Sequence, residues 1–207
     1  MKSFLTACVI LYTFHASVSD KNDTFLYFAY GSNLLARRLH INNPSATFFS
    51  TAQLLNHRLD FNIYIKQWNG AAATIAEDTE SVVWGVVWEL DTKHIASLDK
   101  QEGVNLGTYY AKNVTLFTPE GTALQARTYQ ETVDPPKIPT SRLPIDRQPS
   151  FTYLQVIIYG AFECGLPIDY IRYLFTFPSN KQLAAWSIRD KLGYPFNVTD
   201  YYLIKKK

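Results

Sequence analysis

The sequence predicts a single domain of the mixed α+β class, in which five to six strands form a curved, barrel-like mixed sheet flanked by helices. The chain has 207 residues, enough for one domain with a full core. Its apolar content of 47% and charged content of 18% are ordinary for a globular protein. Strand patterns dominate the first two thirds of the chain and helical patterns the last third, with one helix after the first strand and another after the middle strands.

The first element is a strand that leads through a turn into a helix. Residues 25–30 form a short apolar and aromatic run that is typical of a buried strand. Residues 31–33, Gly-Ser-Asn, break this run. Residues 34–40 then contain helix formers, with Leu35 and Leu39 four positions apart, which predicts a helix.

The middle of the chain predicts three strands and a helix. Residues 59–63 alternate between apolar and polar side chains, as in a half-buried strand. Residues 71–76 and 82–90 predict two more strands, the second apolar enough to be covered on both faces. The helix that follows is predicted to begin after Thr92 as its N-cap and to stop at Gly103.

The rest of the chain predicts a hairpin, a loop and helices. Residues 109–117 and 124–130 form the hairpin, joined around a turn at residues 119–122. Residues 134–149 contain five prolines and predict an extended loop. Periodicity identifies the strands, but it does not show whether their sheet closes into a barrel. Three helices are predicted after the loop, over residues 152–164, 169–175 and 180–192.

The turn at residues 31–33 is the first candidate for chemistry. Where a strand enters a helix, the first backbone N–H groups have no intrahelical partner and lie at the positive end of the helix. Such a position binds a carboxylate or a developing oxyanion. Gly31 allows a ligand to approach the backbone closely, while Ser32 and Asn33 add short polar side chains. The alternative is a capped turn that binds nothing.

Glu102 is the second candidate. On a helix that begins at Thr92, Glu102 falls on the same stripe as Ile95 and Leu98. Asp99 lies about 60° further round the helix. Glu102 is also at the C-terminal end, where the helix dipole disfavours negative charge. Desolvation and the dipole both raise the pKa of a carboxyl group toward the range useful for proton transfer near neutral pH. The alternative is a surface glutamate whose stem skirts the core.

The first residues predict export. A basic start, an apolar run over residues 4–14 and the small residues Ser17 and Ser19 are typical of a signal peptide. The run is too short for a transmembrane span, which needs about 20 apolar residues. We therefore assign residues 1–19 to a cleaved signal peptide and residues 20–207 to the mature domain of a secreted protein. A buried N-terminal strand or helix is the alternative.

Charge and composition argue against several kinds of partner. The net charge of +2 gives no reason to expect nucleic acid or a membrane surface. The four histidines lack metal-ligand spacing, so we expect no metal. Cys164 would be the only cysteine of the mature chain, and we interpret it as buried filler, with a nucleophile as the alternative. Sequons at Asn22, Asn113 and Asn197 favour a secreted glycoprotein.

A series of motifs resembles the γ-glutamylcyclotransferase family. They occur in the family's order and with similar spacing from about residue 25 to residue 167. The likeness is weakest in the proline-rich loop and is absent beyond about residue 176. The matching segments are FLYFAYGSNL at 25–34, NPS at 43–45, WGVVW at 84–88, SLDKQEGV at 97–104, Tyr109, PSFTY at 149–153 and GAFECGLP at 160–167.

This resemblance implies an enzyme that releases an amino acid from a γ-glutamyl amino acid by internal cyclisation, giving 5-oxoproline. No covalent intermediate, metal or cofactor is implied, and the expected assembly is a monomer or a homodimer. Glu102 corresponds to the family's acid–base glutamate. The residues that would bind the small-molecule γ-glutamyl substrate are Tyr27, Phe28, Ala29, Tyr30, Gly31, Ser32, Asn33, Leu34, Tyr109 and Tyr153.

Two features depart from the family, whose familiar members are intracellular enzymes of glutathione turnover. Export is the first departure. The second is Lys100, which stands where close relatives often carry an acidic residue. Helical spacing places Lys100 about 160° from Glu102, so we expect little effect on the pKa of the glutamate. Two other functions stay open: a γ-glutamylamine cyclotransferase acting on γ-glutamyl-lysine-type isopeptides, and a secreted non-catalytic binding protein.

Overall fold

The computed structural model describes residues 23–196. The predicted signal peptide and the sequons at Asn22 and Asn197 lie outside the described residues. Asn113 is described, and its side chain is exposed on a strand.

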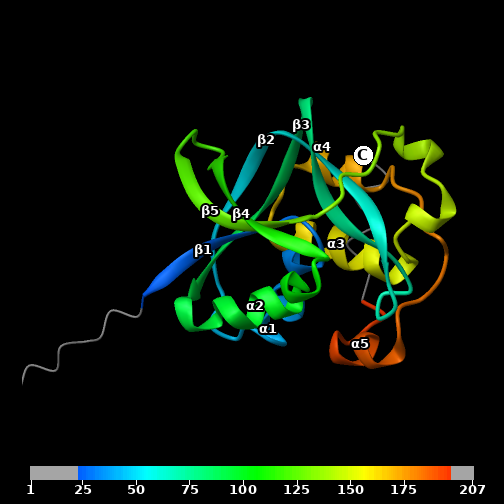
Figure 1. Ribbon diagram of the computed structural model, residues 1–207, viewed down its shortest axis with the longest axis horizontal. Coiled ribbons are helices and arrows are strands. Elements are labelled where there is room, and N and C mark those ends of the chain that lie inside the picture. Colours follow the sequence, from blue (N-terminus) through cyan, green and yellow to red (C-terminus); the bar gives the residue numbers. More distant parts are fainter. Residues whose placement is uncertain (1–22, 197–207) are drawn as a thin grey trace, which may run out of the picture.

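Five strands form a closed barrel in the order β1-β3-β2-β4-β5 (Figure 1). The sheet is mixed, because β1 (Thr24–Ala29) pairs antiparallel with β3 (Gly70–Asp91) and parallel with β5 (Ala123–Glu131). The other two strands are β2 (Thr47–Ile65) and β4 (Tyr109–Phe117). The predicted α+β class and barrel-like sheet are confirmed, and the hairpin of β4 and β5 has its predicted place.

Two strands are longer than predicted. Residues 71–76 and 82–90 belong to one 22-residue strand, β3, and β2 has 19 residues. The segment between the two predicted strands, residues 77–81, is polar and largely exposed, so it interrupts the apolar pattern. It lies at a register shift, where the pairing with β2 passes from Glu77 to Val82 while the strand continues. Register shifts at three places along the β2–β3 pair bend these strands, which lets long strands close a small barrel.

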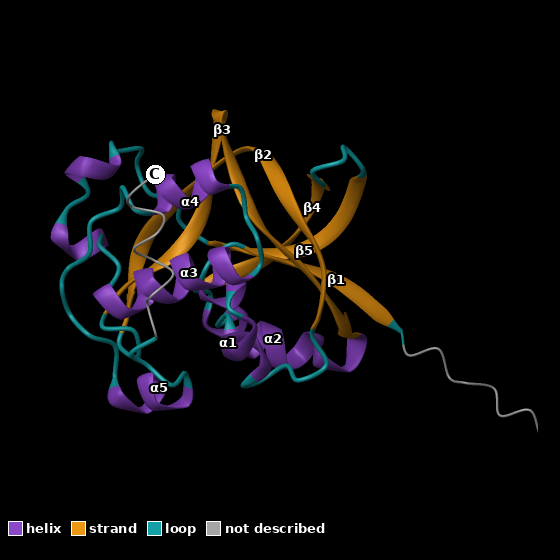
Figure 2. Ribbon diagram, turned by 180° about the vertical axis from the view of Figure 1, so that it is seen from behind, coloured by secondary structure: helices purple, strands orange, loops and turns teal. Residues whose placement is uncertain are grey.

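Helices α2 (Ile95–Gln101), α3 (Phe151–Glu163) and α4 (Ile168–Leu174) lie where the sequence predicts helices (Figure 2). Helix α2 is shorter than predicted, because a separate 3₁₀ turn, η2 (Thr92–His94), precedes it. Thr92 lies within this turn, so its predicted role as N-cap is wrong. The stop at Gly103 is confirmed, since this glycine has a left-handed φ of 68°.

The helix predicted over residues 34–40 is divided in two. A 3₁₀ turn, η1 (Ser32–Leu34), comes first, then Leu35 is extended with φ −79° and ψ 116°, and α1 (Ala36–His40) follows. Leu34, Leu35 and Leu39 are all fully buried. A continuous helix would carry Leu34 and Leu35 on faces 100° apart, whereas the extended residue lets both enter the core.

The helix predicted over residues 180–192 is also wrong in extent, because only α5 (Trp186–Lys191) is helical. The preceding backbone is bonded to other segments instead. The amide of Asn180 donates to a carbonyl of the proline-rich loop, and the amide of Ala185 donates to a carbonyl of the turn after β2. Lys181 has a positive φ of 64°, which no helix accommodates.

Gly160 of α3 lies directly against the backbone that precedes α1. A Cβ atom on Gly160 would lie 2.4 Å from the backbone nitrogen of Leu35 and 2.6 Å from the carbonyl carbon of Leu34. We expect Gly160→Ala to lower the free energy of unfolding by about 1–3 kcal/mol, although alanine is the better helix former. Denaturant unfolding would measure this loss. Phe162→Ala, at an exposed position of the same helix, is the control, and equal losses in both variants would contradict the expectation.

Candidate active site

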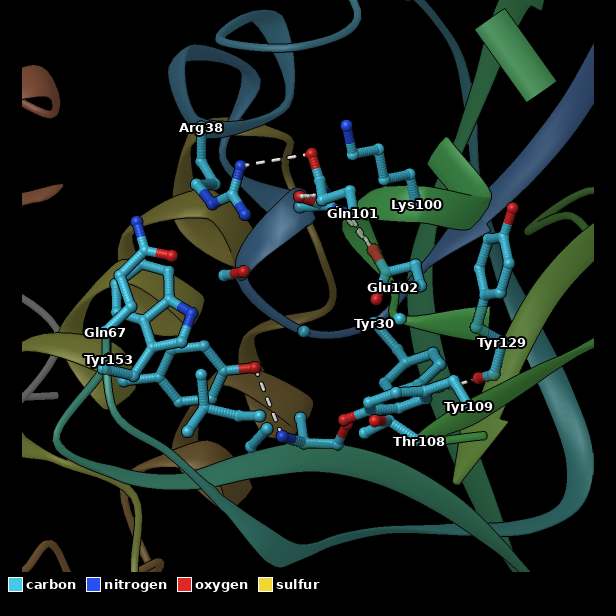
Figure 3. Close-up of a pocket in the computed structure, with 18 of the residues that line it drawn as sticks. Tyr30, Arg38, Gln67, Lys100, Gln101, Glu102, Thr108, Tyr109, Tyr129 and Tyr153 are labelled. Atoms are coloured by element: carbon cyan, nitrogen blue, oxygen red, sulfur yellow. Dashed lines mark hydrogen bonds between the residues drawn. The ribbon is translucent and has the colours of Figure 1, made fainter. Parts of the chain in front are cut away.

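A cavity of about 250 Å³ lies where β1, β3 and β4 meet the turn after β1 and the end of α2 (Figure 3). Pockets for drug-sized ligands enclose about 300–1,000 Å³, so this one suits a smaller molecule. Most of the predicted site residues line it. They are Tyr27, Tyr30, Gly31, Ser32, Asn33, Glu102, Tyr109 and Tyr153.

Three predicted substrate-binding residues do not line the cavity. Phe28, Ala29 and Leu34 are at most 1% exposed and belong to the hydrophobic core. Successive side chains of a strand point to opposite faces, so Phe28 points away from the face that Tyr27 presents to the cavity. Leu34 packs against α3 at Gly160. Their matching positions in the motif therefore reflect the core and not the pocket.

Glu102 follows the last residue of α2, and its carboxyl group enters the cavity (Figure 3). Its Oε1 accepts hydrogen bonds from Asn33 Nδ2 at 3.0 Å and from Gln101 Nε2 at 3.2 Å. Asn33 Nδ2 also donates to the Tyr27 hydroxyl at 2.9 Å, which fixes the orientation of the amide. Among the described residues no hydrogen bond reaches Oε2, so this oxygen is available to a ligand.

Burial raises the pKa of Glu102 above the ordinary value of a glutamate. The positive charge of Arg38 and the hydrogen bonds from Gln101 and Asn33 oppose this shift without cancelling it. The shift has the predicted direction. Desolvation is the main cause of the raised pKa. The helix dipole, the other predicted cause, is small because α2 has only seven residues.

Asp99 lies outside the cavity lining and has its own partners. Its Oδ1 forms an ion pair with Arg127 at 2.7 Å and accepts a hydrogen bond from the Tyr129 hydroxyl. The carboxylate is thus neutralised beside the barrel wall. Glu102 is the carboxyl group of this helix that faces the cavity.

The turn after β1 offers fewer donors than the predicted helix N-terminus. The amides of Leu34 and Leu35 are already bonded to the carbonyls of Gly31 and Ser32, at 3.0 and 3.2 Å. Among the described residues, the amides of Gly31, Ser32 and Asn33 remain without a hydrogen-bond partner and are the donors that this turn can present to a ligand. A three-residue 3₁₀ turn has almost no aligned dipole, so the turn acts through these individual N–H groups.

Three tyrosines form rigid walls of the cavity. The Tyr30 hydroxyl donates to the Tyr129 carbonyl at 2.6 Å, and the Tyr109 hydroxyl donates to the Ala73 carbonyl at 2.8 Å. The Tyr153 hydroxyl accepts from the Ala73 amide at 3.2 Å. Burial raises the pKa of all three, that of Tyr153 to about 12, so they stay neutral.

Lys100 borders the cavity, although its predicted direction was away from Glu102. The helical spacing holds as far as Glu102, whose amide donates to the Leu98 carbonyl at 3.0 Å. Lys100 still borders the cavity because residues 100–103 at the end of α2 all line it. The cation that most lowers the pKa of Glu102 is Arg38, which sequence reasoning missed. Arg38 carries no local signal for a site, since it adjoins the apolar Leu39 in a short helix. Other lining residues that the sequence did not indicate include Gln67, Trp68, Gln101, Thr108 and Tyr129.

Cys164 has the properties of a packing residue. Its thiol contacts the carbonyl of Leu34 at 3.4 Å, and burial raises its pKa to about 12. A thiol with this pKa is a poor nucleophile near neutral pH. In the described part of the chain, no group of three or more His, Cys, Asp or Glu residues is placed to hold a metal ion. No helix within residues 23–196 is long and apolar enough to cross a membrane.

The protein is a closed mixed barrel with a small cavity into which one partly buried carboxyl group points. The model of the AIG2-like family matches residues 82–174 of this chain. γ-Glutamylcyclotransferase from Bos taurus is 43% identical over 166 residues, which cover 78% of this chain and 83% of that protein. The protein of that name from Homo sapiens is 41% identical over 152 residues, covering 72% and 76%. A solved γ-glutamyl cyclotransferase structure superimposes with a TM-score of 0.73 at 36% identity, covering 89% of this chain and all of the other. The chain therefore belongs to the γ-glutamylcyclotransferase family of enzymes, as its motifs predict.

Proposed function

We propose that this protein is a γ-glutamylcyclotransferase that converts γ-glutamyl amino acids into 5-oxoproline and a free amino acid. The observation that carries the proposal is the Glu102 carboxyl group, which lies partly buried in a small cavity and keeps one oxygen free for a ligand. The relatives that bear the name of this activity match 78% and 72% of the chain.

The reaction needs one positioned base and no cofactor. The α-amine of the glutamyl group attacks its own γ-carbonyl carbon, which forms a five-membered lactam and breaks the bond to the leaving nitrogen. Glu102 Oε2 takes the proton that the attacking amine loses and returns it to the leaving nitrogen. Protons balance over the cycle, and Glu102 ends in its starting form.

The amides of Gly31, Ser32 and Asn33 are the donors available to the glutamyl carboxylate or to the oxygen of the tetrahedral intermediate. Preorganised donors of this kind contribute about 3–4 kcal/mol to transition-state stabilisation when well aligned. The buried tyrosines fix the shape of the cavity, which favours the folded conformation of the substrate that cyclises.

An assay of 5-oxoproline release by the purified protein tests this proposal. We expect release from γ-glutamyl-alanine. Release from γ-glutamyl-lysine isopeptide alone would instead establish the γ-glutamylamine activity. Binding of these compounds without release from either would establish a binding protein.

Export of the protein is a further part of the proposal. The N-terminal apolar run supports it, as does the exposed position of the sequon residue Asn113 on β4. Mass spectrometry of the native protein tests both points. We expect an N-terminus near residue 20, and a retained segment 1–19 would contradict export.

A further inference from the structure

Arg38 places a buried positive charge beside the cavity. Its side chain lines the cavity, although the residue is only 8% exposed. Within the described residues its guanidinium makes one hydrogen bond, from Nη1 to Gln101 Oε1 at 3.3 Å, while Nε has no partner. It forms no ion pair with any described carboxylate. The guanidinium therefore has donors to spare for a ligand.

The other arginines in the interior are paired. Arg147 forms an ion pair with Asp60 at 2.7 Å, and Arg58 forms one with the same carboxylate at 3.1 Å. A buried charge without a partner is strongly destabilising. The exception at Arg38 is explained if its partner is an anion that arrives with the substrate.

The surroundings hold Arg38 in place for this role. Its guanidinium lies over the ring of Trp68, 5.8 Å from the ring centre, so its side chain is positioned by an aromatic face. The amide of Gln101 separates it from the catalytic carboxyl group, because this amide accepts from Arg38 and donates to Glu102 (Figure 3). A ligand with a nitrogen one carbon away from a carboxylate could likewise bridge Glu102 and Arg38, with the nitrogen at Glu102 and the carboxylate at Arg38.

We propose that Arg38 binds the carboxylate of the leaving amino acid and thereby selects γ-glutamyl α-amino acids as substrates. This inference rests on the proposed function, in which Glu102 protonates the leaving nitrogen. The carboxylate of an α-amino acid is attached one carbon from that nitrogen, so it falls on the side of Gln101 where Arg38 lies. The Ser32 and Asn33 amides then serve the glutamyl part.

The proposal separates two substrate classes that share the same chemistry. In a γ-glutamyl-lysine isopeptide the leaving nitrogen bears a methylene chain, and its carboxylate is several carbons away. Such a donor leaves Arg38 without a negative partner, which disfavours binding of the isopeptide. Lys100 at the exposed edge of the cavity adds a second positive charge and acts in the same direction.

The experiment compares γ-glutamyl-alanine with γ-glutamyl-alaninamide, a donor of the same shape whose leaving group lacks the carboxylate. We expect the wild-type protein to prefer the acid in kcat/KM by about 10- to 100-fold, the effect of a hydrogen bond between charged groups. Arg38→Gln should reduce this ratio to near one by losing turnover of the acid. The ratio does not depend on the fraction of protein that is folded, so poor folding of the variant does not distort it.

Arg37→Gln is the matched control, because Arg37 is the exposed neighbour, does not line the cavity and loses the same charge. Arg37→Gln should leave the ratio unchanged. Arg38→Lys keeps the positive charge but lacks the two parallel N–H donors of a guanidinium, so it should retain part of the preference for the acid. Equal losses on both donors in Arg38→Gln, or a wild-type ratio near one, would overturn the inference. If the wild-type protein turned over neither donor, the proposed function would be contradicted, but the role of Arg38 in binding would not. Calorimetric binding of the two compounds to wild-type and Arg38→Gln protein would still decide whether Arg38 holds the carboxylate.

Discussion

Replacing Glu102 with glutamine is expected to lower kcat for 5-oxoproline release by about 10²- to 10⁴-fold, the usual contribution of a positioned acid–base group. Glutamine has nearly the same size, and its carbonyl can still accept from Asn33 and Gln101. It cannot take up the proton that the attacking amine must lose. Single-turnover kinetics with γ-glutamyl-alanine would measure the loss in the chemical step.

The pH dependence gives a second readout of the same group. Burial raises the pKa of Glu102, and only the ionised form accepts a proton. We therefore expect wild-type kcat/KM to fall as the pH decreases through this raised pKa, at a higher pH than an ordinary glutamate would give. The remaining activity of Glu102→Gln should lack this acidic limb.

The sign of the stability effect is opposite to that of activity. A carboxyl group with a raised pKa binds more protons in the folded than in the unfolded protein, so stability decreases as the pH rises from the unfolded to the folded pKa. At neutral pH the buried Glu102 carboxylate therefore destabilises the fold. We expect Glu102→Gln to be at least as stable as the wild type there.

Asp99→Asn is the matched control for Glu102→Gln. Asp99 belongs to the same helix but does not line the cavity, and it is paired with Arg127 and with the hydroxyl of Tyr129. This variant should lose stability and retain the acidic limb of the pH profile. Undiminished kcat in Glu102→Gln would contradict the proton-transfer role.

The parts of this fold that the sequence predicted are those with local signals. Helix α3 begins where Ser150 accepts a hydrogen bond from the Tyr153 amide, and α2 ends at the left-handed Gly103. The lengths of β2 and β3 have no such signal. They depend on pairing between strands and on bulges, which keep the polar residues 77–81 within a strand.

The site divides in the same way. Glu102 and the turn after β1 could be found because one lies on an apolar helix stripe and the other follows a buried strand. Arg38 could not, because it lies beside Gln101 and the Glu102 site only after α1 and α2 pack together. A polar residue in a helix is the same in sequence whether it faces solvent or a cavity.

The largest stability effect is expected at Asp60, which joins the barrel to the proline-rich loop. Its carboxylate accepts from Arg147 at 2.7 Å, from Arg58 at 3.1 Å and from the Phe61 amide at 2.8 Å. All three charged side chains are at least 88% buried. The two arginines also donate to the carbonyls of Pro135 and Pro136, so one carboxylate orients both anchors of the loop.

We expect Asp60→Asn to lower the free energy of unfolding by about 3–5 kcal/mol, because two buried cations would lose their only negative partner among the described residues. Denaturant unfolding would measure it, with Asp169→Asn as control. Asp169 pairs with Arg172 at the surface, and its loss should cost at most about 0.5 kcal/mol. Equal effects in the two variants would contradict this account. The loop leads directly into α3, which carries Tyr153 of the cavity wall, so its release should also weaken substrate binding.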